Sequence, residues 1–230
     1  MHIAEGYLPL LHCLGWGVAA AGHVYAGTRG SPTRASSASS ALSATPRAAY
    51  ASAIAFGLLL TSLKLPSLAG TSSHPTGMAL GAALLGPRRM APVALGILLL
   101  QALILAHGGI TTLGANVWSL GVVCPWVTWG GWQLLRRVGV PELAALGVAT
   151  AIGDLATYAA TSGQLAFAQQ ANGTPFWGAF TAILGVFAVT QIPIALAEGV
   201  LTALAWRSML PHAAPASASA SASAPALQDA

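Results

Sequence analysis

Residues 177–206 read WGAFTAILGVFAVTQIPIALAEGVLTALAW, and Glu198 is the only ionisable side chain among them. An α-helix needs roughly 20 consecutive apolar residues to cross the hydrocarbon core of a bilayer. This stretch is longer than that, so it has room to tilt in the membrane or to kink at Pro193. It predicts a transmembrane helix near the carboxyl end of the chain.

The composition of the whole chain agrees with a membrane location. Only 6% of the residues are charged, against roughly 25% in soluble domains, and 55% are hydrophobic. The net charge of +4 does not indicate nucleic-acid binding, because the basic residues occur singly or in pairs between apolar runs. Cys13 and Cys124 both lie in apolar stretches and are interpreted as small buried residues. No basic segment precedes the first apolar run, so nothing there is typical of a signal peptide, and either the chain inserts through its first helix or a leader has been removed ahead of Met1.

Apolar runs of membrane-spanning length recur along the chain and predict an all-α, polytopic protein with about seven transmembrane helices. The third run is short, and its glycine and proline content indicates that it begins in an irregular loop. The expected spans are approximately 8–26, 48–65, 70–86, 91–107, 115–135, 143–168 and 177–206.

The arginines orient these spans, because cytoplasmic loops are enriched in basic residues. All eight arginines fall on alternate connections, and only Lys64 falls on the other side. We therefore expect the N-terminus outside and the C-terminus in the cytoplasm. The membrane unit is expected to cover residues 1–210, including a cytoplasmic linker at 27–47, and residues 211–230 are expected to be a disordered low-complexity tail.

Three of the six histidines gather on the predicted outer face, namely His2, His74 and His107. His2 follows directly after Met1, so the terminal amine, the next backbone nitrogen and the imidazole Nδ1 can chelate one metal ion in nearly one plane. His74 is the candidate for the fourth corner, and such nitrogen-rich tetragonal sites suit Ni(II) and Cu(II), with Co(II) held similarly. The alternative is that His2 is a solvated side chain and that His74 caps a helix or bonds a backbone carbonyl.

The segment AHGGITTLGAN, residues 106–116, is too polar and too rich in glycine for a lipid-facing helix. Irregular backbone at membrane depth is tolerated where it is buried in protein or lines a cavity. We expect residues 107–116 to fold back over the metal pocket, with His107 and Asn116 as hydrogen-bond partners that orient the ligands. The alternative is that the glycines only allow a tight turn.

Two other classes of protein remain to be distinguished from a metal-capture protein. A membrane enzyme with a histidine-bound zinc would need an H-E-x-x-H motif or a carboxylate near His74 in the sequence, and neither is present. A self-sufficient metal permease would favour ionisable groups along a pathway or paired repeats, and no convincing internal repeat is found. The chain is therefore not expected to be an enzyme.

Several long strings resemble the CbiM family, the substrate-capture component of cobalt transporters of the energy-coupling factor type. They are MHIAEGYLP at residues 1–9, SLKLPSLAGTSSHPTGMALGAALLGP at 62–87, QALILAHGGITTLGANVWSLGVVCP at 101–125, GDLATYAATSGQLA at 153–166 and FAVTQIPIALAEG at 187–199. The resemblance runs from residue 1 to about residue 207, apart from the linker and the tail. The family often has Gly or Cys where Ser72 and Ser73 stand here, a difference that spares the histidine.

The resemblance implies a seven-helix component of the bacterial inner membrane that binds Co(II) or Ni(II) as its transported substrate. The implied ligands are the amine of Met1, the backbone nitrogen and imidazole of His2, and the imidazole of His74. The implied partners are a CbiN-like small membrane subunit, a CbiQ-like coupling protein and a CbiO-like ATPase, and the implied purpose is cobalamin biosynthesis. No G-x-x-x-x-G-K-[ST] phosphate loop occurs in the chain, so ATP would be hydrolysed by a separate subunit. Nickel and cobalt are not distinguished by these ligands, although the loop around His74 looks more like the cobalt branch.

Overall fold

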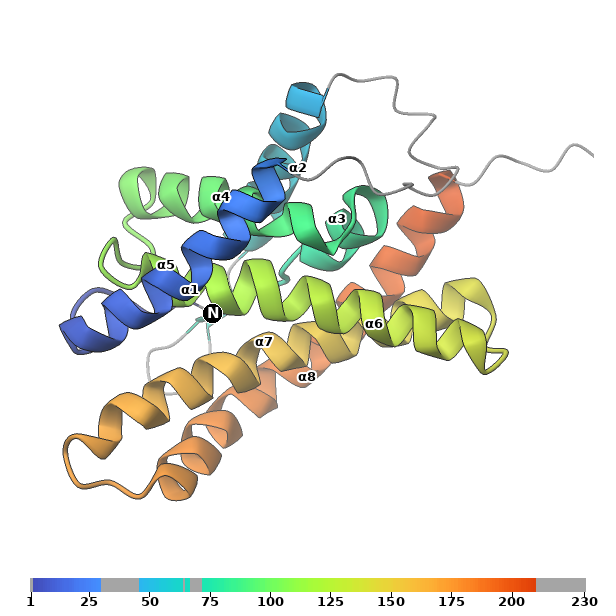
Figure 1. Cartoon of the computed structure of the whole chain (residues 1–230). Helices are drawn as coiled ribbons and strands as arrows, with labels where there is room; N and C mark the ends of the chain where they lie inside the picture. Colours follow the sequence, from blue (N-terminus) through green and yellow to red (C-terminus); the bar gives the residue numbers. More distant parts are fainter. Residues whose placement is uncertain (1, 30–45, 64, 67–71, 210–230) are drawn as a thin grey trace, which may run out of the picture.

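The computed structural model describes residues 2–29, 46–63, 65–66 and 72–209, and they fold into an assembly of helices (Figure 1). Met1, the tail and residues 30–45 of the expected linker lie outside the described residues, whereas residues 27–29 and 46–47, which were expected to belong to the linker, are helical. The helices and short segments, in chain order, are α1 (Leu10–Arg29), α2 (Pro46–Ser62), β1 (Leu65–Pro66), β2 (Ser72–Ser73), α3 (Met78–Leu85), the 3₁₀ turn η2 (Pro87–Arg89), α4 (Met90–Ile104), α5 (Leu113–Val117), the π-helical turn η3 (Trp118–Val123), α6 (Cys124–Arg137), α7 (Glu142–Gln170) and α8 (Phe176–Met209). The expected all-α architecture is confirmed, with β1 and β2 forming only a two-residue antiparallel pairing of Leu65 with Ser73 and Pro66 with Ser72.

Among the described residues, three helices are long and apolar enough to cross a bilayer. They are Pro87–Ile104, which joins η2 to α4, and the long helices α7 and α8, and the shorter apolar helix Tyr50–Ser62 accompanies them. The count of seven spans and the sides on which the two ends lie stay predictions. The expected span at 115–135 is one continuous rod built from α5, η3 and α6, which starts at Leu113 and ends at Arg137.

The expected third span is much shorter in the structure than its apolar run at 70–86. Helix α3 begins only at Met78, because Pro75 disfavours a helical residue before it and Gly77 adopts a left-handed conformation with φ of 67°. The preceding residues form a loop that carries His74. This loop reaches into the interior of the protein, where His74 has no exposed surface.

Helices α7 and α8 pack along each other and α6 packs against α7, as Figure 1 shows for the long pair in yellow and orange. Close approach depends on Gly147 and Gly199, since a Cβ atom at residue 199 would lie 2.5 Å from the carbonyl oxygen of Gly147. Small residues permit such contacts between membrane helices, where van der Waals packing replaces the hydrophobic effect. The two helices therefore lie in close contact, and both contribute side chains that touch the loop of His74.

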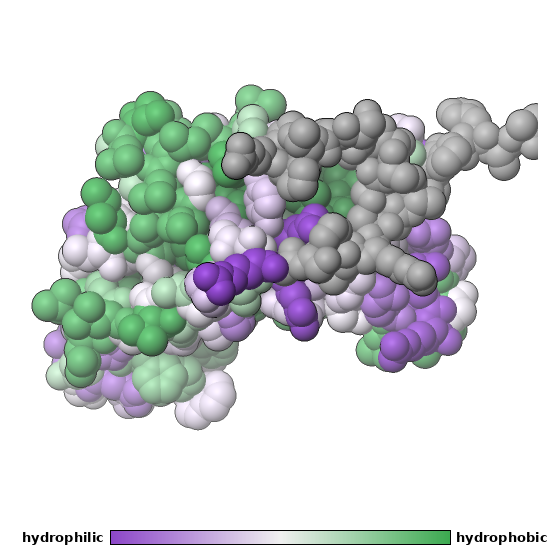
Figure 2. Space-filling model, turned by 45° about the horizontal axis from the view of Figure 1, so that its top comes forward, coloured by the Kyte–Doolittle hydropathy of each residue, from purple (hydrophilic) through white to green (hydrophobic). Residues whose placement is uncertain are grey.

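Many large apolar side chains are exposed on the surface, and many polar side chains are buried beside the apolar core, unlike in a typical soluble protein. Leu103, Val200 and Leu204 are each more than half exposed, and Figure 2 shows broad hydrophobic areas on the visible face. In the interior, Gln191 Nε2 on α8 donates to Asp154 Oδ2 on α7 at 2.6 Å. This distribution supports the multi-pass membrane location that the composition predicts.

Candidate metal centre

The N-terminal segment enters the helix assembly and is held there by its backbone. Ile3 is 2% exposed and packs with Leu8, Cys13 and other apolar residues of one core cluster. Its N–H donates to Asn116 Oδ1 at 2.7 Å, and its carbonyl oxygen accepts from Asn116 Nδ2 at 3.0 Å and from the Thr112 hydroxyl at 2.6 Å. Because Asn116 bonds both polar groups of Ile3, it fixes the backbone one residue after His2.

Glu5 fastens the same segment to the loop that follows α4. Its carboxylate accepts from the N–H of Ile110 at 2.7 Å, from the N–H of Thr111 at 3.3 Å and from the hydroxyl of Thr111. The hydroxyl of Thr111 and, to a smaller extent, these N–H groups lower the pKa of the Glu5 carboxyl from its ordinary value, against the opposing effect of desolvation. The charged form is therefore the form that holds residues 110–111 beside the N-terminal segment.

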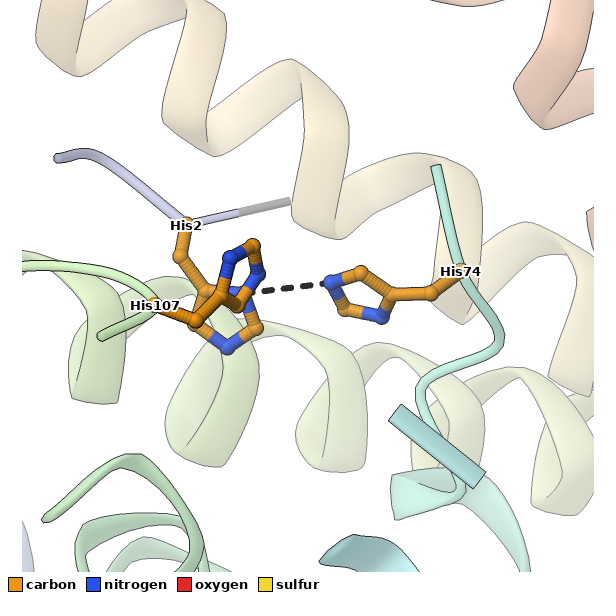
Figure 3. Close-up of side chains that lie close together, drawn as sticks. All are labelled: His2, His74 and His107. Atoms are coloured by element: carbon orange, nitrogen blue, oxygen red, sulfur yellow. Dashed lines mark hydrogen bonds between the residues drawn. The ribbon is translucent and has the colours of Figure 1, made fainter. Parts of the chain in front are cut away.

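Three imidazoles meet where this segment, the loop of His74 and the loop after α4 converge (Figure 3). One ligand atom from each of His2, His74 and His107 lies within 4.8 Å of the others, and this is the one group of three or more potential metal-ligating side chains found in the described part of the chain. The rings of His2 and His74 are nearly parallel, with centroids 4.8 Å apart and an interplanar angle of 26°. Three histidines from distant segments thus form one cluster, and their role as metal ligands stays a prediction.

The hydrogen bonds of His74 define which of its nitrogens faces the cluster. Its Nδ1 lies 3.0 Å from the carbonyl oxygen of Pro75, and because a carbonyl only accepts, Nδ1 carries a proton. In the neutral ring this leaves the Nε2 lone pair directed at His2 Nδ1, 3.1 Å away. Two nitrogens bound to one ion at right angles, each at about 2.1 Å, lie about 3.0 Å apart. The pair is therefore spaced for two neighbouring corners of one metal ion.

Buried groups on α7 and α8 anchor the loop that carries His74, a residue with no exposed surface. Glu198 Oε2 accepts from the N–H of Thr76 at 2.6 Å, and its Oε1 accepts from the Thr76 hydroxyl and the N–H of Gly77, both at 2.8 Å. The N–H of His74 lies 3.5 Å from the hydroxyl oxygen of Tyr158. These contacts hold the loop on both sides of Pro75.

Glu198 is the one ionisable residue of the apolar stretch 177–206, and the structure shows it bonding the loop of His74. The signal that could have found this role is an acidic residue in an otherwise apolar span, which must be satisfied inside the protein. The sequence does not say by which donors, since Glu198 and Thr76 lie 122 residues apart.

The structure thus places the predicted site residues as follows. It brings His2, His74 and His107 together, and it puts Asn116 on the backbone of Ile3. Met1, the first predicted ligand, lies outside the described residues. His107 was predicted as a hydrogen-bond partner of the ligands, and its ring lies against both other rings, with centroids 4.7 Å from His2 and 6.1 Å from His74.

Comparison with known proteins gives a consistent answer. Residues 2–216 match the family CbiM, described as the cobalt uptake substrate-specific transmembrane region. A cobalt transport protein CbiM from Streptomyces coelicolor is 45% identical over 212 residues, which cover 91% of this chain and 88% of the relative. A protein of the same name from Propionibacterium freudenreichii is 44% identical over 217 residues, covering 94% of this chain and 89% of the relative.

Solved structures share the fold. A truncated transition metal transporter superposes with a TM-score of 0.76 at 25% identity, covering 91% of this chain and 98% of that one. A second transition metal transporter, at 24% identity, superposes with a TM-score of 0.77 over 91% of this chain and 92% of its own.

Proposed function

Because the chain belongs to the CbiM family of cobalt-uptake transmembrane proteins, we propose that it captures cobalt(II) for an ATP-driven importer of the energy-coupling factor type. The chain is a transport component of the bacterial cell membrane and not an enzyme. The proposal adds the chemistry of capture, the side of the membrane on which it occurs, and the partners that supply the energy.

Four nitrogens bind the ion in this proposal: the amine of Met1, the backbone nitrogen and Nδ1 of His2, and Nε2 of His74. The first two close a five-membered ring with the metal, and the backbone nitrogen and imidazole of His2 close a six-membered ring. The observation that carries the proposal is the 3.1 Å separation of His2 Nδ1 and His74 Nε2, with the proton of His74 held on the opposite nitrogen by Pro75.

The donor set explains which ions are excluded. No carboxylate belongs to the cluster among the described residues, and Glu5 is occupied by the N–H groups of residues 110 and 111. Magnesium and calcium require oxygen ligands, whereas imidazole and amide nitrogens suit later transition metals. Nickel(II) is the alternative substrate, because the same four nitrogens serve it equally well.

Energy must come from another chain, since no phosphate-binding loop occurs in this sequence. We propose a CbiO-like ATPase, a CbiQ-like coupling protein and a CbiN-like small membrane subunit as partners, with the imported ion feeding cobalamin biosynthesis. The ion is captured at the outer face and released inward after the loaded component reorients.

The test is to block the amine and to remove the imidazole separately. An extension of two residues ahead of Met1 is preferable to one, because a histidine at the third position would itself form a four-nitrogen chelate without His74. We expect this extension and His74→Ala each to lower cobalt affinity by about 100-fold or more, measured by titration and by metal analysis of the purified protein. His23→Ala, a change in helix α1, serves as the control. Unchanged cobalt binding in the extended protein would rule out the amine as a ligand.

A further inference from the structure

His107 is the third imidazole of the cluster, and its ring is turned across the other two. It makes an interplanar angle of 67° with His2 and of 72° with His74, whereas His2 and His74 lie within 26° of each other. An imidazole that binds along the axis of a donor plane close to the rings of His2 and His74 must stand steeply across those rings, and the ring of His107 does so.

The distances place His107 within reach of the same ion. The three ligand atoms lie within 4.8 Å of one another. A nitrogen that binds an ion at about 2.1 Å along the axis lies about 3.0 Å from each nitrogen of the plane. Binding by His107 therefore requires its nitrogen to move by up to about 1.8 Å, which rotation of the side chain can supply.

The backbone on both sides of His107 is held in an unusual conformation that directs the residue into the cluster. Ala106 has φ of 46°, the one positive value at a non-glycine residue in the described ranges, and Gly108 has φ of 84°. The N–H of His107 donates to the carbonyl oxygen of Gln101 at 3.0 Å, which fixes this turn. A Cβ atom at residue 108 would lie 3.5 Å from His2 Cβ, so the turn packs directly against the predicted ligand. Strain of this kind is found where a side chain must be presented for function.

We propose that His107 supplies a fifth nitrogen to the bound ion from outside the plane of the other four, and that this donor favours cobalt(II) over nickel(II). The proposal rests on the four-nitrogen capture site proposed above. The His107 lone pair forms the new bond, in place of a water where one occupies that position, and no electron is transferred.

The preference follows from the number of d electrons. In a strong planar nitrogen field, nickel(II) with eight d electrons fills the orbital that points along the axis, and this filled orbital repels a fifth donor. Cobalt(II) with seven holds one electron there, so a fifth nitrogen makes a net bond. Planar sites therefore suit nickel and copper, and an added axial imidazole shifts the balance toward cobalt.

The experiment compares the full-length purified wild-type protein with His107→Gln, each loaded with cobalt(II) under argon. A single axial nitrogen, whose nucleus has a spin of one, splits each cobalt hyperfine line in the high-field electron paramagnetic resonance feature of low-spin cobalt(II) into three. We expect this triplet in the wild type and its loss in His107→Gln. We also expect cobalt affinity to fall by about tenfold or more while nickel affinity stays within about twofold.

Nickel binding reports on folding, because it needs the other four nitrogens in place. His12→Gln, a change of a histidine on α1, is the matched control and should keep the triplet and both affinities. A wild-type cobalt spectrum without the triplet, or an equal fall in both affinities in His107→Gln, overturns the fifth ligand while leaving the four-nitrogen site intact. Failure of the wild type to bind cobalt at all overturns the proposed function instead.

Discussion

Asn116 bonds the backbone of Ile3 through both ends of its side-chain amide, accepting from the N–H and donating to the carbonyl. In Asn116→Asp the acceptor is retained, but a carboxylate oxygen then faces the Ile3 carbonyl. We expect cobalt affinity to fall by about 10- to 100-fold, because the backbone of Ile3, the residue after His2, is then no longer held in place. Isothermal titration is the measurement. Ser119→Ala is the control, since its hydroxyl is equally buried but bonds only carbonyls of its own helix rod, and an unchanged affinity in Asn116→Asp would contradict the positioning role.

At this scale the sequence predicted the residue types better than their contacts. His2, His74 and His107 could be assembled from the arginine topology alone, and the structure brings them together. The two hydrogen bonds between Asn116 and Ile3 could not be predicted, because the residues are 113 positions apart and another buried acceptor and donor would have satisfied the same backbone groups. The choice of Nε2 on His74 likewise depends on where Pro75 directs its carbonyl.

Helix α8 acts on the site through one buried carboxylate. Glu198 receives three hydrogen bonds from Thr76 and Gly77, and a glutamine there retains one oxygen while turning an amide group toward one of these donors. We expect Glu198→Gln to lower the free energy of unfolding by about 1–3 kcal/mol, the cost of an unsatisfied buried group. Cobalt affinity should fall with it, because His74 lies on the same loop.

The two effects are measured by denaturation in detergent and by cobalt titration. Glu142→Gln is the matched control, since Glu142 at the start of α7 accepts only from Trp206 Nε1 at 3.3 Å. If Glu198→Gln destabilises the fold but binds cobalt like the wild type, α8 supports the helices and not the loop of His74.

The helix boundaries illustrate what periodicity and length can predict. The expected spans at 143–168 and 177–206 correspond to α7 and α8 within a few residues, because long apolar runs end at polar or glycine-containing turns. The glycine and proline content of the span at 70–86 predicts that it begins in an irregular loop, and the helix is indeed confined to Met78–Leu85 after Pro75 and Gly77. The π-helical turn η3 within the α5–α6 rod has no signal in the sequence at all.

Across the whole molecule, the apolar surface faces the lipid, whereas the candidate site for metal capture is a separate cluster of histidines. The lipid-facing surface is apolar, and the ionisable residues Asp154 and Glu198 are buried between helices, where they satisfy neighbouring donors. The nitrogens proposed to bind the metal belong to the N-terminal segment or to the loops of His74 and His107 beside it. An ion therefore meets no competing carboxylate in the described cluster, and proton release becomes the main cost of binding it.

The whole-molecule prediction is that cobalt binding strengthens steeply with pH. In the proposed site the amine of Met1 and the backbone nitrogen of His2 each release a proton to solvent when they bind the ion, so protons compete with the ion and affinity falls as pH decreases. Two released protons give a change of about 100-fold per pH unit while both remain bound in the free protein. The lowered pKa of Glu5 limits its anchor only at lower pH: its contribution to the fold is present above the ordinary carboxyl range and is lost as pH falls through the folded pKa. Titrations between about pH 6.5 and pH 7.5, which lie below the ordinary pKa of an α-amine and about two units above the ordinary carboxyl pKa, should therefore show this slope in both wild type and Glu5→Gln. A flat profile in the wild type would contradict the amine and amide ligands, since imidazoles alone release few protons in the upper half of that range.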